Sequence, residues 1–401
     1  MNDLVFATIS EGAYKYLAEK LKIKLQYLND HELKGKRKYW VGHELSVADI
    51  YLYSLLEVAS DLLQWPFGAN TKAYFEGLKK SGFNKPALEF LAKHPEISVA
   101  DKTVWHSYET DGGVGTPTAE RKSFFRTSSN HSSSSDTKSS TSLPHPTFSF
   151  SPIFPKIIPN INNNSNNNST KSQESSTCSN RTSTKPIATL YYATTSSGVA
   201  NVIAAHRAGI LGTKLVASSD YLTINPKGNV PAIVLHENNT ATAENTILFE
   251  NAATLQWIMD HATSPVGPAP ETDEIYLVQS KLSFISSEIH SLLTDLLSSN
   301  SNTDARKYLS EKLKEKMQYA NDIEFADNSN GSVDGGENGG TKYWVGNAYS
   351  IADAYGAFIF AAAEFTGIQL LSFPNLKKYV DGINELNFVQ EANDIISDQT
   401  P

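Results

Sequence analysis

Residues 219–235 read SDYLTINPKGNVPAIVL, and this stretch decides how the fold of the second half of the chain is interpreted. The sequence NPKG at 225–228 has the composition of a tight turn, because proline fixes φ and glycine tolerates left-handed backbone. Val230 and Pro231 follow, and an apolar run then continues to Leu235. A turn by itself would mark only the start of an edge strand. A turn, a Val-Pro pair and a buried strand in this order are much less common, so we expect a specialised loop here.

The segments on both sides of this loop alternate between strand and helix patterns. Short runs rich in aromatic and β-branched residues predict strands, and apolar residues at helical spacing predict helices. The order along the chain is strand 189–192, helix 198–209, strand 230–235 and helix 250–260, followed by a long helix over 274–297. This alternation, with its helical continuation, predicts an α/β unit followed by an all-α unit.

An internal repeat links the two ends of the chain. Residues 16–30 (YLAEKLKIKLQYLND) match residues 308–322 (YLSEKLKEKMQYAND), and both segments predict amphipathic helices. Residues 38–51 (KYWVGHELSVADIY) match residues 342–355 (KYWVGNAYSIADAY). The chain therefore contains one and a half related modules, and the second copy has gained an acidic, glycine-rich loop over about 327–340.

Each copy carries a helix-start signature in its second matched segment. Ser46 and Asp49 in the first copy, and Ser350 and Asp353 in the second, take N-cap and N3 positions, where each side chain can bind the other residue's backbone N–H. The run AYGAFIFAAAEF that follows is apolar nearly all round, which predicts a helix in the middle of a bundle. A membrane-spanning helix is the alternative, but the run is too short and Glu364 interrupts it.

The residues between the two copies, 107–186, are dominated by Ser, Thr and Asn. Such a segment cannot bury enough apolar surface to offset the entropy of ordering, so we predict a disordered linker. Within it, residues 147–159 (TFSFSPIFPKIIP) are apolar enough to dock on another surface, and residues 121–129 (RKSFFRTSS) place basic residues near Ser and Thr. A docking motif and a phosphorylation site are the alternatives to an ordinary linker.

Composition excludes several classes of function. The formal net charge of the 401 residues is −9 and there is no Lys/Arg cluster, which argues against nucleic acid and against an anionic membrane surface as partners. No apolar stretch approaches the roughly 20 residues that span a bilayer, and the N-terminus lacks a secretory pattern, so we expect a cytoplasmic protein. The single cysteine, Cys178, permits no internal disulfide, no cysteine metal cluster and no CxxC redox pair, and no metal site is expected.

The stretch 219–235 resembles the loop and strand that bind glutathione in cytosolic glutathione transferases, and in the beta class in particular. The resemblance implies a multidomain glutathione transferase fold. A thioredoxin-like α/β domain would occupy residues 187–263 and an all-α helical domain residues 264–401. A partial copy of the helical domain, residues 1–106, and the disordered linker, residues 107–186, would precede them.

The resemblance implies which residues bind glutathione. In the family the Val-Pro peptide bond is cis, and the residue before the proline pairs through its backbone with the cysteinyl part of glutathione, like an added strand. Val230 and Pro231, with the adjacent Asn229, take these positions.

A second family marker is LFENAATLQWI at 248–258, which places Glu250 and Asn251 at the start of a helix. Free N–H groups there would receive the γ-glutamyl carboxylate, and the acidic side chain would pair with its ammonium group. Asn251 replaces the usual Ser or Thr and keeps the ability to act as an N-cap. A purely structural helix cap is the alternative.

Alignment with the beta class places Ser197 at the position of the family's cysteine. The hydroxyl would stand before a helix that starts near Val199 and donate a hydrogen bond to the glutathione thiolate, the species that the chemistry needs. Ser196, Thr195 and Tyr192 are rivals for this role, and an ordinary N-cap is the alternative for Ser197. Without the cysteine this site cannot form a mixed disulfide with glutathione, which disfavours thiol–disulfide reductase activity.

Residues 282–290 (LSFISSEIH) are similar to part of the first long helix of beta-class proteins, whose histidine points towards glutathione. His290 would be that residue, although a lone histidine on a helix is more often a surface or core residue. Two family positions differ here, because Ser291 replaces a basic residue and Ser283 replaces an asparagine.

The leading interpretation is an enzyme that conjugates the thiolate of glutathione, its co-substrate, to a small electrophile, with glutathione-dependent peroxidase activity as a second reaction. The alternative is a non-catalytic, glutathione-transferase-like regulatory protein that engages a protein partner through the N-terminal helical module. That module lacks every glutathione-binding residue named above. The family implies a homodimer, and the sequence does not identify the electrophile.

Overall fold

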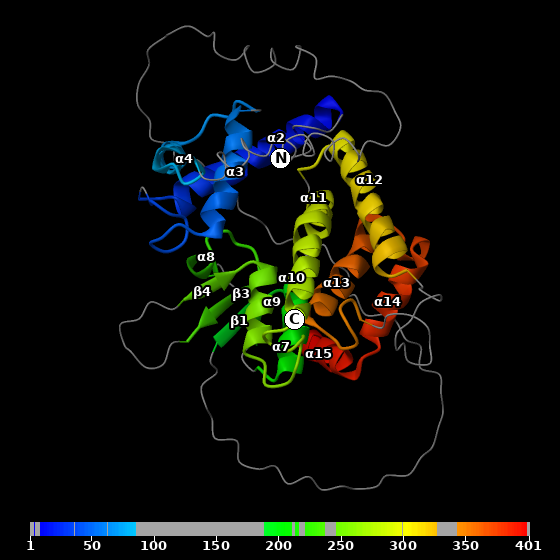
Figure 1. Cartoon of the computed structure of the whole chain (residues 1–401). Coiled ribbons are helices and arrows are strands. Elements are labelled where there is room, and N and C mark those ends of the chain that lie inside the picture. Colours follow the sequence, from blue (N-terminus) through cyan, green and yellow to red (C-terminus); the bar gives the residue numbers. More distant parts are fainter. Residues whose placement is uncertain are drawn as a thin grey trace, which may run out of the picture. The chain divides into compact units, whose positions relative to one another are not determined.

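The computed structural model describes residue 4 and residues 9–35, 37–61, 63–85, 188–210, 213–215, 221–236, 246–298, 300–326 and 343–398. The predicted linker over 107–186 and the predicted acidic loop over 327–340 lie outside these described residues. The chain divides into two compact units, one composed of residues 1–8 and 17–147 and the other of residues 9–16 and 148–401 (Figure 1).

The described part of the first repeat copy is helical. It contains α2 (Glu11–Tyr27), α3 (Val47–Asp61) and α4 (Ala69–Ser81), with a π-helical turn η1 (Leu28–Glu32) at the end of α2. Its small core is apolar and partly aromatic, and consists of Leu28, Leu33, Leu52, Tyr53, Leu56, Tyr74, Phe75 and Leu78. The helix predicted at 16–30 is confirmed, and it begins earlier and ends in the π-helical turn.

A four-stranded sheet opens the second half of the chain. Its strands are β1 (Ala188–Tyr192), β2 (Thr213–Leu215), β3 (Ala232–Leu235) and β4 (Ile247–Phe249), in the order β2-β1-β3-β4. β1 runs parallel to β2 and antiparallel to β3, which runs antiparallel to β4. The strands expected at 189–192 and 230–235 are confirmed, whereas the two edge strands were not predicted.

Helices α7 (Gly198–Ala208) and α9 (Asn251–Asp260) pack against each other beside this sheet, and the short α8 (Tyr221–Ile224) precedes β3 (Figure 1). α7 contacts β1, while α9 contacts β3 and β4. Gly209 ends α7 with φ +75°, a conformation that glycine adopts without steric cost. This arrangement agrees with the predicted thioredoxin-like α/β unit.

The helical half follows as a bundle. α10 (Glu274–Phe284), a π-helical turn η3 (Ile285–His290) and α11 (Ser291–Leu297) form the long helix expected over 274–297. The other elements are α12 (Thr303–Tyr319), η4 (Ala320–Glu324), α13 (Ile351–Ala362), the short 3-10 turns η5 (Ala363–Thr366) and η6 (Leu370–Ser372), α14 (Pro374–Asn384) and α15 (Asn387–Asp398). α13 is buried over most of its length and contacts α7, α10 and α14, as predicted for a central helix. Within the described chain, no helix has both the length and the apolarity to cross a membrane.

The repeat is reproduced at the level of single hydrogen bonds. In each copy one fully buried aspartate accepts four hydrogen bonds. The donors are the backbone N–H of a tryptophan, the backbone N–H and the hydroxyl of a serine, and the hydroxyl of a tyrosine. The donors to Asp49 are Trp40, Ser46 and Tyr74, at 2.6–2.9 Å, and the donors to Asp353 are Trp344, Ser350 and Tyr379, at 2.8–2.9 Å. The predicted capping box is complete in the second copy.

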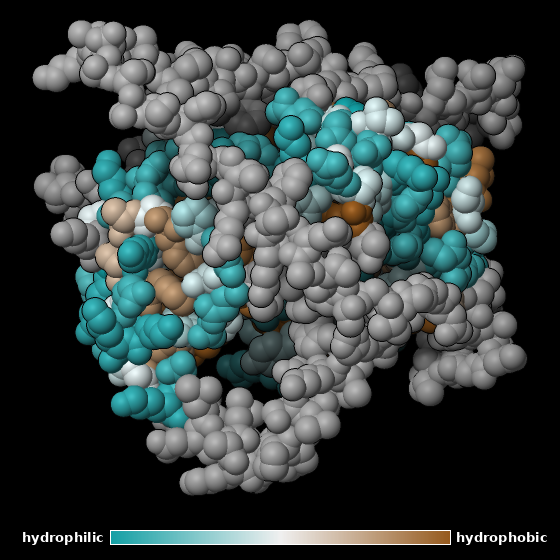
Figure 2. Space-filling model, turned by 90° about the horizontal axis from the view of Figure 1, so that it is seen from above, coloured by the Kyte–Doolittle hydropathy of each residue, from teal (hydrophilic) through white to brown (hydrophobic). Residues whose placement is uncertain are grey.

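The copies differ in what covers the helix that follows this aspartate. In α13, Ile351, Ala354 and Tyr355 are 0%, 2% and 0% exposed. The matching residues of α3 are Val47, Ile50 and Tyr51, at 82%, 44% and 66%. On the face shown in Figure 2, hydrophobic residues of the described chain gather only in small patches among hydrophilic ones.

Candidate functional site

A buried asparagine holds the loop between α8 and β3. The Asn225 amide donates to the backbone carbonyl of Asn229 at 2.6 Å and to its side-chain oxygen at 2.8 Å, and accepts from the backbone N–H of Lys227 at 3.1 Å. The Tyr221 hydroxyl donates to the same Asn229 carbonyl at 2.7 Å. The peptide bond Val230–Pro231 is cis, as the resemblance implied. The loop conformation is thus fixed from inside the protein, by a residue that is fully buried.

The sheet register brings this loop beside two other predicted residues. Continued by one residue, the β1–β3 and β3–β4 ladders place Pro231 level with Tyr192 on one side and with Glu250 on the other. The Val-Pro pair, the start of α9 and the turn before α7 therefore lie at the same end of the sheet, where β1 and β4 finish and β3 begins.

Glu250 is the residue immediately before α9, and its backbone has φ +71°, which is uncommon for a residue with a side chain. Its carboxylate does not cap the helix. Instead, Glu250 Oε1 lies 2.5 Å from Lys227 Nζ, and the two side chains are 63% and 25% exposed. Glu250, the acidic residue of the LFENAATLQWI segment, is thus paired with Lys227 of the NPKG loop.

Ser197 is buried at the position before α7, and its hydroxyl makes no hydrogen bond to any residue that the structure describes. The cap is made one residue earlier, because Ser196 Oγ accepts from the Gly198 N–H at 3.1 Å and donates to the Ala193 carbonyl at 2.8 Å. Ser197 therefore occupies the N-cap position of α7 without making a capping hydrogen bond through its side chain. Tyr192 is fully buried in the core, which raises the pKa of its hydroxyl.

Asn251 connects the two helices beside the sheet. It is the first residue of α9, and its amide donates to the Ser197 carbonyl at 3.3 Å, while its side-chain oxygen accepts from the Asn201 amide. The expectation that Asn251 acts as an N-cap is wrong, because Glu250 takes that position and Asn251 bonds to α7. Asn201 is fully buried, and its own Oδ1 has no hydrogen-bond partner among the described residues.

His290 ends the π-helical turn η3 and contacts α13. Its Nδ1 lies 2.7 Å from the hydroxyl of Tyr355. Burial lowers the pKa of His290 to about 4, although the nearby Glu250 carboxylate acts in the opposite direction. Burial raises the pKa of Tyr355, and a hydrogen bond from the Asn251 side chain acts to lower it. A polar chain thus runs from His290 through Tyr355 and Asn251 to the backbone of Ser197.

Three residues of this arrangement were missed by sequence reasoning. Asn225 had a local signal, because asparagine at the start of a turn commonly binds the backbone two residues on. Asn201 and Tyr355 had none, since they sit inside helices whose apolar pattern predicts only core positions.

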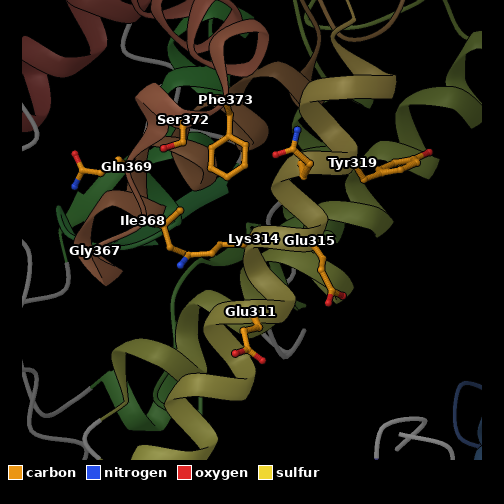
Figure 3. A pocket seen from close by; sticks show the side chains of 10 residues that line it. Glu311, Lys314, Glu315, Tyr319, Gly367, Ile368, Gln369, Ser372 and Phe373 are labelled. Carbon is orange, nitrogen blue, oxygen red and sulfur yellow. The ribbon is translucent and has the colours of Figure 1, made fainter. Parts of the chain in front are cut away.

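A cavity of about 870 Å³ lies away from these residues, between α12 and the turns after α13. Its lining residues are Glu311, Lys314, Glu315, Gln318, Tyr319, Gly367, Ile368, Gln369, Ser372 and Phe373. Figure 3 shows Glu311, Lys314 and Glu315 along α12 on one side, with the Lys314 side chain extending towards the segment 367–373. None of the predicted glutathione-binding residues lines this cavity. Within the described residues, no group of three or more His, Cys, Asp or Glu could hold a metal ion.

Two segments of the chain match family models, both described as glutathione S-transferase, C-terminal domain. The matches cover residues 302–387 and residues 6–84, one in each repeat copy. Among curated proteins, the chain is similar to the glutathione S-transferase GstA of Escherichia coli O157:H7, with 24% identity over 185 residues, which are 46% of this chain and 81% of GstA.

The chain is also similar to solved structures. A sphingomonad glutathione S-transferase complexed with glutathione is 24% identical, with a TM-score of 0.44, and the match covers 52% of this chain and 98% of that one. A glutathione transferase homologue from Lodderomyces elongisporus, with two glutathione molecules per subunit, is 21% identical, with a TM-score of 0.44, and the match covers 53% and 99%.

Proposed function

We propose that this chain, which carries the glutathione transferase fold and a partial second copy of its C-terminal helical domain, binds glutathione at the end of the sheet beside Pro231 and conjugates it to small electrophiles. The observation that supports this most is the convergence of three features at that end of the sheet. They are the Val-Pro pair before β3, the start of α9 at Glu250, and the turn that carries Ser197.

Glutathione would bind in an extended conformation. The backbone of Val230 would pair with its cysteinyl part, as in the addition of a strand to a sheet edge. The N-terminus of α9 would receive the γ-glutamyl carboxylate, because free N–H groups and the helix dipole favour an anion there. The Glu250 carboxylate would bind the γ-glutamyl ammonium group, either in place of Lys227 or together with it.

The chemical step needs the glutathione thiol as a thiolate, since an ordinary cysteine thiol has a pKa of about 8.5 and is mostly protonated at neutral pH. Ser197 would stabilise the thiolate by donating a hydrogen bond, and its hydroxyl is uncommitted among the described residues. The N-terminus of α7 would act in the same direction. The thiolate then attacks the electrophilic carbon, forming a carbon–sulfur bond and displacing the leaving group with its electron pair.

A conjugation assay with a general aromatic electrophile tests this assignment. We expect Ser197→Ala to lower kcat/KM by roughly tenfold or more, as for the loss of a hydrogen bond to a charged group. Ser196→Ala is the matched control, because it removes a neighbouring hydroxyl that is already engaged in capping α7. Equal activity of wild type and Ser197→Ala would contradict the role of Ser197. The same pair, assayed with an alkyl hydroperoxide, tests the peroxidase reaction.

A second candidate is non-catalytic binding of a protein partner through the first copy. The exposed face of α3 favours it, since Val47 and Tyr51 match residues that are fully buried in α13. In the second copy the matching helix, α13, contacts α7, α9 and α10. The partner that fits α3 is therefore another thioredoxin-like domain with an uncovered helical face.

A photo-crosslinking amino acid in place of Tyr51 tests this. Capture of a thioredoxin-fold chain supports the second candidate, whereas capture of unrelated chains, or of none, contradicts it. Light scattering on the purified chain tests the homodimer that the family implies.

A further inference from the structure

We propose that Tyr355 is a positioning residue, which holds His290 in the tautomer with its proton on Nε2 and so presents this histidine to a ligand as a hydrogen-bond donor. The assignment of the tautomer stands on the hydrogen-bond geometry alone. The consequence for catalysis rests on the proposed function.

The Ser197 carbonyl decides which group donates and which accepts in this series of hydrogen bonds, because a backbone carbonyl can only accept. The Asn251 atom at 3.3 Å from it must therefore be Nδ2. The side-chain oxygen of Asn251 then faces Asn201, which must donate through its own Nδ2. The orientation of both amides follows from one acceptor and needs no assumption about hydrogens.

Tyr355 is fully buried, and among the described residues its hydroxyl has one hydrogen-bond acceptor, His290 Nδ1, at 2.7 Å. If Nδ1–H donated to Tyr355 instead, the buried phenol proton would be left without an acceptor, which costs free energy. The hydroxyl therefore donates to Nδ1. Nδ1 therefore accepts, and a neutral imidazole that accepts at Nδ1 carries its proton on Nε2.

The surroundings of His290 support a neutral ring. Burial places its pKa at about 4, so the ring carries one proton at neutral pH. Among the described residues, the side chain of His290 makes one hydrogen bond, from Nδ1 to Tyr355, so Nε2 makes none. Nε2–H is thus available to a ligand anion near Glu250, such as a thiolate or a carboxylate. His290 would stabilise an anion rather than remove a proton.

Heteronuclear NMR on the full chain, labelled with ¹⁵N-histidine at pH 7, tests the tautomer directly. His290→Gln identifies the signals of His290 by their loss. In the wild type we expect a protonated Nε2 and an unprotonated Nδ1. In Tyr355→Phe, Nδ1 loses its donor and the ring should become a mixture of tautomers. A protonated Nδ1 in the wild type, or an unchanged tautomer in Tyr355→Phe, would overturn the proposal.

Thermal unfolding of Tyr355→Phe and His290→Gln identifies a variant that fails to fold.

Calorimetry separates the proposal from the proposed function. If the wild type binds glutathione, Tyr355→Phe should weaken binding by roughly threefold to tenfold. His290→Gln should weaken it by a similar factor, because either change removes an oriented donor. If the wild type binds no glutathione, the proposed function fails, and the spectra still decide the tautomer. Wild-type affinity in Tyr355→Phe together with weak binding in His290→Gln would overturn the positioning role.

Discussion

Lys227 Nζ lies 2.5 Å from Glu250 Oε1, so the cation of the NPKG loop is paired with the carboxylate that we expect to hold the ammonium group of glutathione. An ammonium group that binds at Glu250 would meet a carboxylate whose Oε1 is already paired with Lys227, so Lys227 weakens the attraction of that carboxylate for a second cation. The ion pair is partly exposed and screened by solvent, so it contributes little to stability.

Removing this competitor should strengthen glutathione binding. For Lys227→Met we expect a severalfold tighter dissociation constant in calorimetry, with a loss of less than about 1 kcal/mol in the free energy of unfolding. Glu250→Gln should weaken binding, since it removes the shared carboxylate. Weaker binding in Lys227→Met would mean that Lys227 itself contacts glutathione.

Asn225 should act on glutathione binding without contacting glutathione. Asn225→Ala removes the buried amide that holds the Asn229 carbonyl and the turn at Lys227. We expect a loss of about 1–3 kcal/mol in stability and a higher KM for glutathione, with kcat less affected. Leu222→Ala, at a residue of α8 that is 58% exposed, is the control. A variant with a lower kcat and an unchanged KM would contradict a positioning role for this loop.

The two repeat copies offer a matched pair of substitutions. Ile351→Glu places a charge in a site that is 0% exposed, which should cost more than about 3 kcal/mol of unfolding free energy. Val47→Glu changes the equivalent residue at 82% exposure and should cost less than about 0.5 kcal/mol. Denaturant titration compares the two. A large loss in Val47→Glu would show that the face of α3 is covered in the native protein.

The partly buried His290 should make the stability of the fold depend on pH. Its folded-state pKa of about 4 lies below the usual unfolded value of about 6.5, so between these values the unfolded chain binds the extra proton. The stability contributed by the neutral ring is complete above about pH 6.5 and is lost as the pH falls towards 4, by at most about 1.4 kcal/mol per pH unit. Urea midpoints of wild type and His290→Gln at several pH values measure this difference, and parallel curves would contradict the burial of His290.

The sequence predicted those features that depend on local pattern or on the repeat. The strand at 189–192, the helix at 198–209 and the equivalence of Asp49 and Asp353 all follow from periodicity and from matched segments. The family models find the same two copies of the helical domain. The short strands β2 and β4 were missed, because three residues give too little pattern to distinguish a strand from a loop.

The candidate site was predictable only in part, for a physical reason. Pro231 and Glu250 could be proposed from the sequence because each lies in a motif that is continuous in sequence. The roles of Asn251 and Tyr355 depend on contacts between α9, α7 and α13, and no local pattern reports which side chains meet across helices. The N-cap alternative for Ser197 could not be decided from the sequence, because Ser196 lies next to it and its hydroxyl is the one that accepts from the Gly198 N–H.

Calorimetric titration of the full chain with glutathione tests the central claim most directly, with Glu250→Gln and Val47→Glu as companions. The account predicts binding at one site per chain, weaker binding in Glu250→Gln, and wild-type binding in Val47→Glu, because the first copy carries none of the predicted binding residues. The absence of binding by the wild type, or a second equal site that Val47→Glu removes, would contradict it.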